Sequence, residues 1–183
     1  DLVRSRGLGD VYKRQVLLFG SDEATRHLPE GLYKALMGFH SGWRYIILIL
    51  MVLGIWFGFQ TSKGKRPFAG ATKKMGMFTM ISIDLQLVAG LLLYFNWIST
   101  QTNFKISNIA SQMGVAIFRN IALDHAIGML IAIIFIHIGY AKAKKALNDA
   151  DAGRKQFIWF LIAFILILVS IPWPFLYETR GWV

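Results

Sequence analysis

The chain has 183 residues, of which 55% are hydrophobic and 16% are charged, and its net charge is +10. Soluble domains are less apolar than this, so the composition predicts an integral membrane protein in contact with a lipid bilayer. Cysteine is absent, which excludes disulfide bonds and thiolate metal sites. The basic residues lie mainly in short segments beside apolar runs and no nucleic-acid-binding motif accompanies them, so we expect no nucleic-acid partner.

Residues 1–31 differ in character from the rest of the chain. The segment 10–15, DVYKRQ, matches the translation of an adapter used in sequencing libraries, so residues 1–15 resemble an assembly artefact. Residues 16–20 form an apolar run that is too short for the core of a signal peptide. We therefore expect residues 1–31 to be an artefact or a disordered extension, and residues 32–183 to form a single membrane domain.

Four apolar runs follow, at about 40–60, 75–97, 118–141 and 157–176. Each has at least the ~20 residues that a helix needs to cross a bilayer core of about 30 Å. The connection between the second and third runs is the longest, and its apolar residues recur at three- and four-residue steps, which favours an amphipathic helix at the interface. The other connections are short, which favours antiparallel neighbours. We predict an all-α integral membrane protein built as an up-down four-helix bundle.

The distribution of charge predicts the orientation of these spans. Loop 61–74 carries five basic residues and no acidic residue, and loop 142–156 carries five basic and two acidic residues. On the other side of the membrane, the connection between the second and third spans has only Lys105 and the adjoining Arg119. Cytoplasmic loops are enriched in lysine and arginine. We therefore place both loops in the cytoplasm, and both termini on the outer side of a bacterial cytoplasmic membrane.

Two histidines lie at similar depth in parallel spans. His40 opens the first span and His125 lies a few residues into the third, on what would be diagonally opposed helices of the bundle. Two neutral imidazoles that face each other across a bundle core are the axial ligands of a six-coordinate b-type haem. Arg44 lies on the same helix face as His40, and either Arg44 or Arg119 could neutralise a haem propionate. Alternatively, these side chains simply reach the headgroups at the interface.

Polar residues inside the spans suggest a second, different contact. His137 follows His125 by twelve residues, so it is rotated from it by about 120° and faces another direction. Asp84 lies inside the second span, close to Gln86. A buried Asp84–His137 pair would serve as a structural contact or as part of a proton path. This pair favours the alternative function of a non-redox scaffold, an accessory subunit or a small carrier.

Several motifs occur in the same order as in a group of small bacterial four-helix membrane proteins identified as cytochrome b-like, which residues 32–183 resemble. They include His40-Ser41-Gly42-Trp43-Arg44, Asp84-Leu85-Gln86-Leu87, Asp124-His125 and Ile171-Pro172-Trp173-Pro174-Phe175. Residue by residue, the resemblance picks out His40, Arg44, Gln86 and His125. The family commonly has histidine at position 84 and usually none at position 137. A further possibility is therefore that the family's histidine in the second span is a ligand, and that this chain, which has Asp84 there, has lost it.

The placement of the two histidines, together with the resemblance, predicts an electron-transfer protein with one haem b near the outer face of the membrane. His40 and His125 would be its axial ligands, and quinone or a subunit of a respiratory complex would be its partner. No motif of hydrolytic or group-transfer enzymes is present in the sequence. We therefore expect an electron-transfer or accessory protein more than a stand-alone enzyme.

Overall fold

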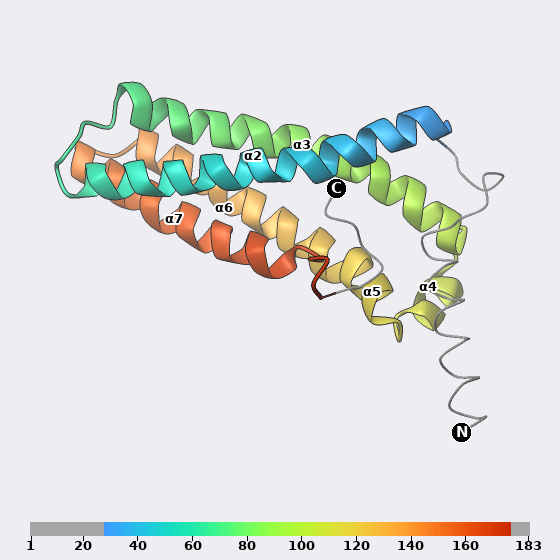
Figure 1. Ribbon diagram of the computed structural model, residues 1–183. Coiled ribbons are helices and arrows are strands. Elements are labelled where there is room, and N and C mark those ends of the chain that lie inside the picture. Colours follow the sequence, from blue (N-terminus) through green and yellow to red (C-terminus); the bar gives the residue numbers. More distant parts are fainter. Residues whose placement is uncertain (1–27, 177–183) are drawn as a thin grey trace.

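The computed structural model describes residues 28–176, and within this range it contains helices and no strand. The long helices are α2 (Glu30–Ser62), α3 (Gly70–Thr102), α6 (Ala126–Lys144) and α7 (Asp149–Ser170), with the short α4 (Ile106–Gln112) and α5 (Ala116–Arg119) and the π-helix η2 (Asn120–His125) between α3 and α6 (Figure 1). The segment expected to be an adapter artefact, residues 1–15, lies outside the described residues.

Within residues 28–176, four helical segments are long and apolar enough to cross a membrane: α2, α3, the continuous stretch Ala116–Lys144, and α7. The predicted number of long apolar helices is therefore confirmed for this part of the chain. The helices extend beyond the predicted runs, because α2 and α3 have 33 residues each, or about 50 Å at 1.5 Å per residue. Polar residues at the level of the headgroups continue the helix, and a search for apolar runs does not include them.

The fourth predicted span, 157–176, is displaced along the sequence. Helix α7 begins at Asp149, where the side chain of Asn148 accepts a hydrogen bond of 2.8 Å from the backbone N–H of Asp151. This N-cap satisfies an otherwise free backbone donor, so the helix starts within the polar loop. It ends at Ser170, two residues before Pro172, as expected for a residue that cannot continue a helix.

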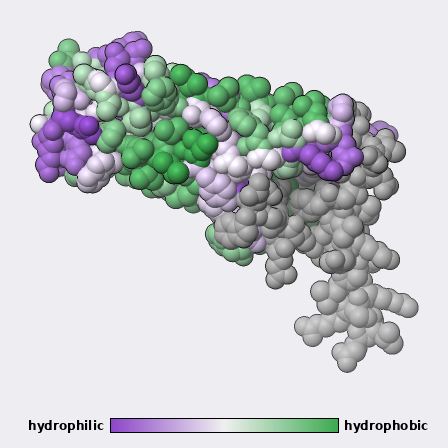
Figure 2. Space-filling view, turned by 45° about the horizontal axis from the view of Figure 1, so that its top comes forward, coloured by the Kyte–Doolittle hydropathy of each residue, from purple (hydrophilic) through white to green (hydrophobic). Residues whose placement is uncertain are grey.

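The long helices pack as neighbouring pairs. Helix α2 packs against α3 and α7, and α6 packs extensively against α7 and less so against α3. The α2–α3 and α6–α7 connections lie at the same end of the molecule (Figure 1). Met51, Ile136 and Phe160 are fully buried between the helices. On the face shown in Figure 2, hydrophobic residues cover the middle, and hydrophilic residues gather at one end and in a smaller patch toward the other, as expected for helices surrounded by lipid.

Glycines let α2 and α7 approach closely near the connecting loops. A Cβ atom added at Gly58 would lie 2.9 Å from the backbone nitrogen of Phe157, and one added at Gly153 would lie 2.7 Å from the carbonyl oxygen of Gly58. The carbonyl of Gly54, one turn away, accepts a hydrogen bond of 2.9 Å from the fully buried Gln156. Small residues and buried amides are typical of helix contacts in membranes, where hydrophobicity alone does not bring helices together.

We predict that Gly153→Ala destabilises the protein, because its methyl group would overlap backbone atoms that cannot move aside. The expected loss is about 1–3 kcal/mol of unfolding free energy, as for overpacked cores, measured by thermal unfolding in a fixed detergent. Gly42→Ala is the matched control, since nothing lies within 4 Å of its added Cβ, and it should stabilise helix α2 by about 0.5–1 kcal/mol. Equal melting temperatures for the two variants would contradict this account of the contact.

Candidate functional site

A cavity of about 520 Å³ lies between α2, α3, η2, α6 and the end of α7. Its volume is in the range of small-molecule and cofactor sites, roughly 300–1,000 Å³. Most of its wall is apolar, including Leu87, Met129, Leu130 and Ile167. The polar side chains that line it include His40, Arg44, Gln86 and His125, and others such as Asn96, Thr100 and Gln101 lie farther along its wall. The first four are residues that the resemblance singles out.

The structure brings His40 and His125 together across this cavity. Their ring centres are 6.2 Å apart and the ring planes lie at 80° to each other. His40 comes from α2 and His125 from the junction of η2 and α6, two segments that make little direct contact elsewhere. The two imidazoles thus approach each other from helices that the rest of the fold holds apart.

A hydrogen bond fixes the orientation of His125. Its Nδ1 lies 3.1 Å from the carbonyl oxygen of Ser170, at the end of α7. A carbonyl can only accept, so this contact requires the hydrogen on Nδ1 and leaves a lone pair on Nε2. Metal-binding histidines commonly have this arrangement, in which the second nitrogen donates to a carbonyl. His125 therefore has the tautomer whose Nε2 could bind a metal.

The helix that carries His125 has a wide turn just before it. Residues Asn120–His125 form the π-helix η2, a rare geometry that is frequent at functional sites because it shifts the register of the following side chains. The hydroxyl of Tyr94 on α3 donates a hydrogen bond of 3.2 Å to the carbonyl of Ala122 within this turn. Tyr94 thereby supports the segment that positions His125.

Helix α3 positions His40 through two residues. The side-chain Nε2 of Gln86 donates a hydrogen bond of 2.6 Å to the backbone carbonyl of His40. One turn further, a Cβ atom at Gly90 would lie 2.9 Å from Cε1 of the His40 ring, so a larger residue would force the imidazole to move from this position. The Oε1 atom of Gln86 is buried and has no hydrogen-bond partner within the described residues. An unpaired buried acceptor at this position is costly unless a bound molecule satisfies it.

Of the two arginines suggested for a propionate, the structure brings one to the cavity. Arg44 lines it, donates a hydrogen bond of 2.8 Å to the hydroxyl of Tyr45, and has its guanidinium carbon 5.9 Å from the ring centre of Trp173. Arg119 is exposed on α5 and is not among the lining residues. The cationic group at this cavity is therefore that of Arg44.

Asp84 and His137 lie next to each other, away from the cavity. Asp84 Oδ2 is 3.4 Å from His137 Nε2, and His137 Nδ1 is 3.0 Å from the carbonyl of Ile133. The expected pair was a buried one, but the side chains are 46% and 41% exposed. The reason is that α3 and α6 pack together only sparsely, so the pair lies at the outer boundary of these helices. Neither residue lines the cavity between the histidines.

The arrangement of donors suits a metal that brings its own equatorial ligands. Residues 28–176 contain no group of three or more His, Cys, Asp or Glu side chains that could hold a bare metal ion. A haem iron takes four nitrogens from the porphyrin and needs only two from the protein. Two imidazoles bound at ~2 Å to one iron have ring centres about 6 Å apart, which is close to the separation of His40 and His125.

No protein-family model, curated protein or solved structure matches this chain. The function is therefore argued from the residues of the cavity. Sequence reasoning had identified His40, Arg44, Gln86 and His125. It missed Gly90 and Tyr94, which resemble other small and aromatic residues of an apolar helix, and the backbone carbonyl of Ser170, which no side chain reveals.

Proposed function

We propose that this protein is a membrane b-type haem protein that transfers electrons. The observation that carries the proposal is the pair of imidazoles, His40 and His125, with ring centres 6.2 Å apart in an apolar cavity of about 520 Å³. When bound there, the haem would supply one-electron chemistry, and its potential would depend on the axial ligands and on burial. The residues that line the cavity would hold it and keep water away from it.

The roles of the individual side chains follow from their contacts. His40 and His125 would bind the haem iron, and the hydrogen bond of His125 Nδ1 to the Ser170 carbonyl would raise the basicity of its Nε2. Gly90 leaves space for the ring of His40. Arg44 would neutralise a propionate, since a guanidinium binds carboxylate in a bidentate manner. Gln86 would offer Oε1 as an acceptor at the same cavity.

The proposal includes an arrangement in the membrane. The four spans form an up-down bundle with both termini on the outer side, and loops 61–74 and 142–156 lie in the cytoplasm of a bacterium. The cavity then lies toward the outer face of the cytoplasmic membrane, because the basic loops are at the opposite end of the helices. The redox partner of the protein at that face would be a quinone or a subunit of a respiratory complex.

The contact between Asp84 and His137 supports a second candidate function. Ionisable residues inside membrane spans are rare and commonly mark ion or proton pathways. A non-redox scaffold, an accessory subunit or a small carrier would use this pair, at 3.4 Å, and would not need the cavity. The two proposals differ in which histidine of the third span matters, His125 or His137.

Absorbance spectra distinguish these functions. We expect protein purified from haem-replete cells to give the reduced-minus-oxidised bands of a low-spin b haem. His40→Ala and His125→Ala should each lose these bands, because one axial nitrogen is removed. His137→Ala is the matched control in the same continuous stretch, Ala116–Lys144, and should keep them. A wild-type sample without haem absorbance would refute the proposal, as would spectra unchanged in both ligand variants.

The two arginines give a second prediction. Arg44→Gln should lower the midpoint potential of the haem on the order of tens of millivolts, because loss of a nearby cation favours the more positive, oxidised iron. Arg119→Gln is the control that removes the same charge outside the cavity, and its potential should stay close to that of the wild type. Potentiometric titration monitored by absorbance measures both. Equal shifts in the two variants would place Arg44 outside the electrostatic reach of the haem.

The orientation can be tested with single cysteines, because the chain contains none. Lys65→Cys lies in the first basic loop and Lys105→Cys at the start of α4, and both positions are exposed. In spheroplasts, a membrane-impermeant maleimide should label Lys105→Cys directly and Lys65→Cys only after permeabilisation. The reverse pattern would invert the proposed topology without affecting the haem proposal.

A further inference from the structure

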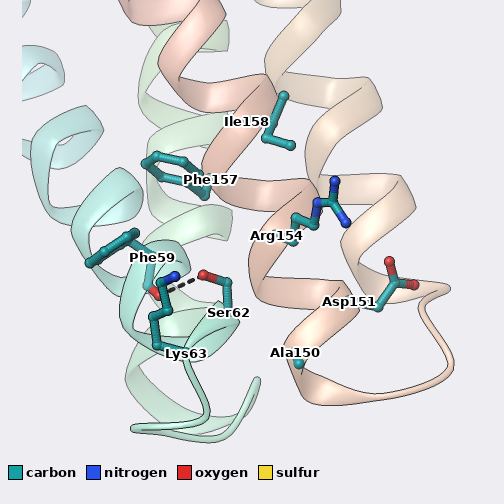
Figure 3. Close-up of a pocket in the computed structure, with 8 residues that line it drawn as sticks. All are labelled: Phe59, Ser62, Lys63, Ala150, Asp151, Arg154, Phe157 and Ile158. Carbon is teal, nitrogen blue, oxygen red and sulfur yellow. Dashed lines mark hydrogen bonds between the residues drawn. The ribbon is translucent and has the colours of Figure 1, made fainter.

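A second cavity, of about 480 Å³, lies at the opposite end of the helices, beside the basic loops. Phe59, Ser62 and Lys63 line it from the end of α2, and Asp151, Arg154 and Phe157 line it from the first turns of α7 (Figure 3). The two helices are in close contact just beside it, through Gly58 and Gly153. The cavity is therefore held between two firmly packed elements.

The charged groups of this cavity leave an excess of positive charge. Lys63 and Arg154 are exposed, and neither forms an ion pair with a carboxylate in the described part of the chain. Asp151 is the acidic residue that lines the cavity, and its carboxylate is paired with Lys155 Nζ at 2.5 Å. Two cations thus remain for an anion, and an arginine with a lysine suits a phosphate group.

Next to the two cations, the wall of the cavity is apolar. The rings of Phe59 and Phe157 pack with their centres 5.5 Å apart, and Lys63 Nζ lies 5.7 Å from the centre of the Phe59 ring. Ile158, also in the lining, is followed on the same face of α7 by Ile162 and Ile165. These three isoleucines are 39%, 41% and 53% exposed. An apolar strip therefore leads from the cations toward the middle of the span.

We propose that this cavity binds the phosphate of an anionic phospholipid. Lys63 and Arg154 contact the phosphate, and an acyl chain lies along Ile158, Ile162 and Ile165. Free phosphate would use the cations but not the apolar strip, whereas a phospholipid uses both. Basic cavities between membrane helices at the cytoplasmic face are known to suit anionic headgroups. The site is separate from the histidine cavity and does not depend on haem.

Native mass spectrometry of the purified full-length chain tests this proposal, with dioleoylphosphatidylglycerol, dioleoylphosphatidylcholine and inorganic phosphate as probes. We expect the wild type to bind phosphatidylglycerol about tenfold more tightly than phosphatidylcholine, and the double variant Lys63→Ala/Arg154→Ala to lose about this factor. Lys73→Ala/Lys74→Ala is the matched control, since it removes two exposed cations at the same end of the molecule, outside the cavity. Its affinity should remain within about twofold of the wild type.

The exchanged variant Lys63→Arg/Arg154→Lys keeps both charges, so it should retain the preference for phosphatidylglycerol even if the alanine variant is unstable. Equal weakening in the alanine variant and the control would mean diffuse attraction to a basic surface and would overturn the proposal. Competition by millimolar inorganic phosphate would assign the cavity to free phosphate instead of lipid. An absence of preference between the two phospholipids would also overturn it.

Discussion

The hydrogen bond between His125 Nδ1 and the carbonyl of Ser170 is the contact on which the candidate site depends. An imidazole between apolar helices costs free energy unless its polar atoms find partners. The Ser170 carbonyl is available because α7 ends there, where the last carbonyls of a helix lack intrahelical donors. The end of the fourth span thus fixes a ring of the third span. Its other nitrogen can then face His40, 6.2 Å away between ring centres.

The sequence was sufficient for the four long apolar helices and for four of the polar residues that line the cavity, His40, Arg44, Gln86 and His125. Long apolar runs predicted the four helices, and the shared direction of the first and third runs predicted that His40 and His125 lie at similar depth. The ends of the helices were harder to predict from the sequence. Polar residues such as Asn148 continue or cap a helix at the membrane surface, and nothing in their hydropathy distinguishes them from a loop. The π-turn of η2 and the space at Gly90 depend on how α3 and α6 pack, which no local pattern encodes.

The two histidines of the third span illustrate the difference between spacing and packing. The two side chains lie about 120° apart around the helix axis, which predicts that they face different neighbours. In the structure, His125 lines the cavity and His137 contacts Asp84 outside it. Rotation alone does not say how deeply a side chain is buried. The sparse contact between α3 and α6 leaves Asp84 and His137 nearly half exposed. Because Asp84 and His137 contact each other, their polar atoms are partly shielded, and the pair can lie at the outer boundary of α3 and α6 without an enclosing pocket.

Helix α2 makes two kinds of contact along its length, and this explains where the cavity between His40 and His125 lies. Near the basic loops, Gly54 and Gly58 allow Phe160 and the backbone of α7 to come within van der Waals distance, and Gln156 bonds to the Gly54 carbonyl. A cofactor could not enter between the facing backbones of α2 and α7 there without breaking these contacts. At the other end, α7 stops at Ser170 and α6 begins with a widened turn, so no helix fills the space beside His40. A rigid end and an open end in the same helices let the protein keep its fold while leaving room for a large ligand.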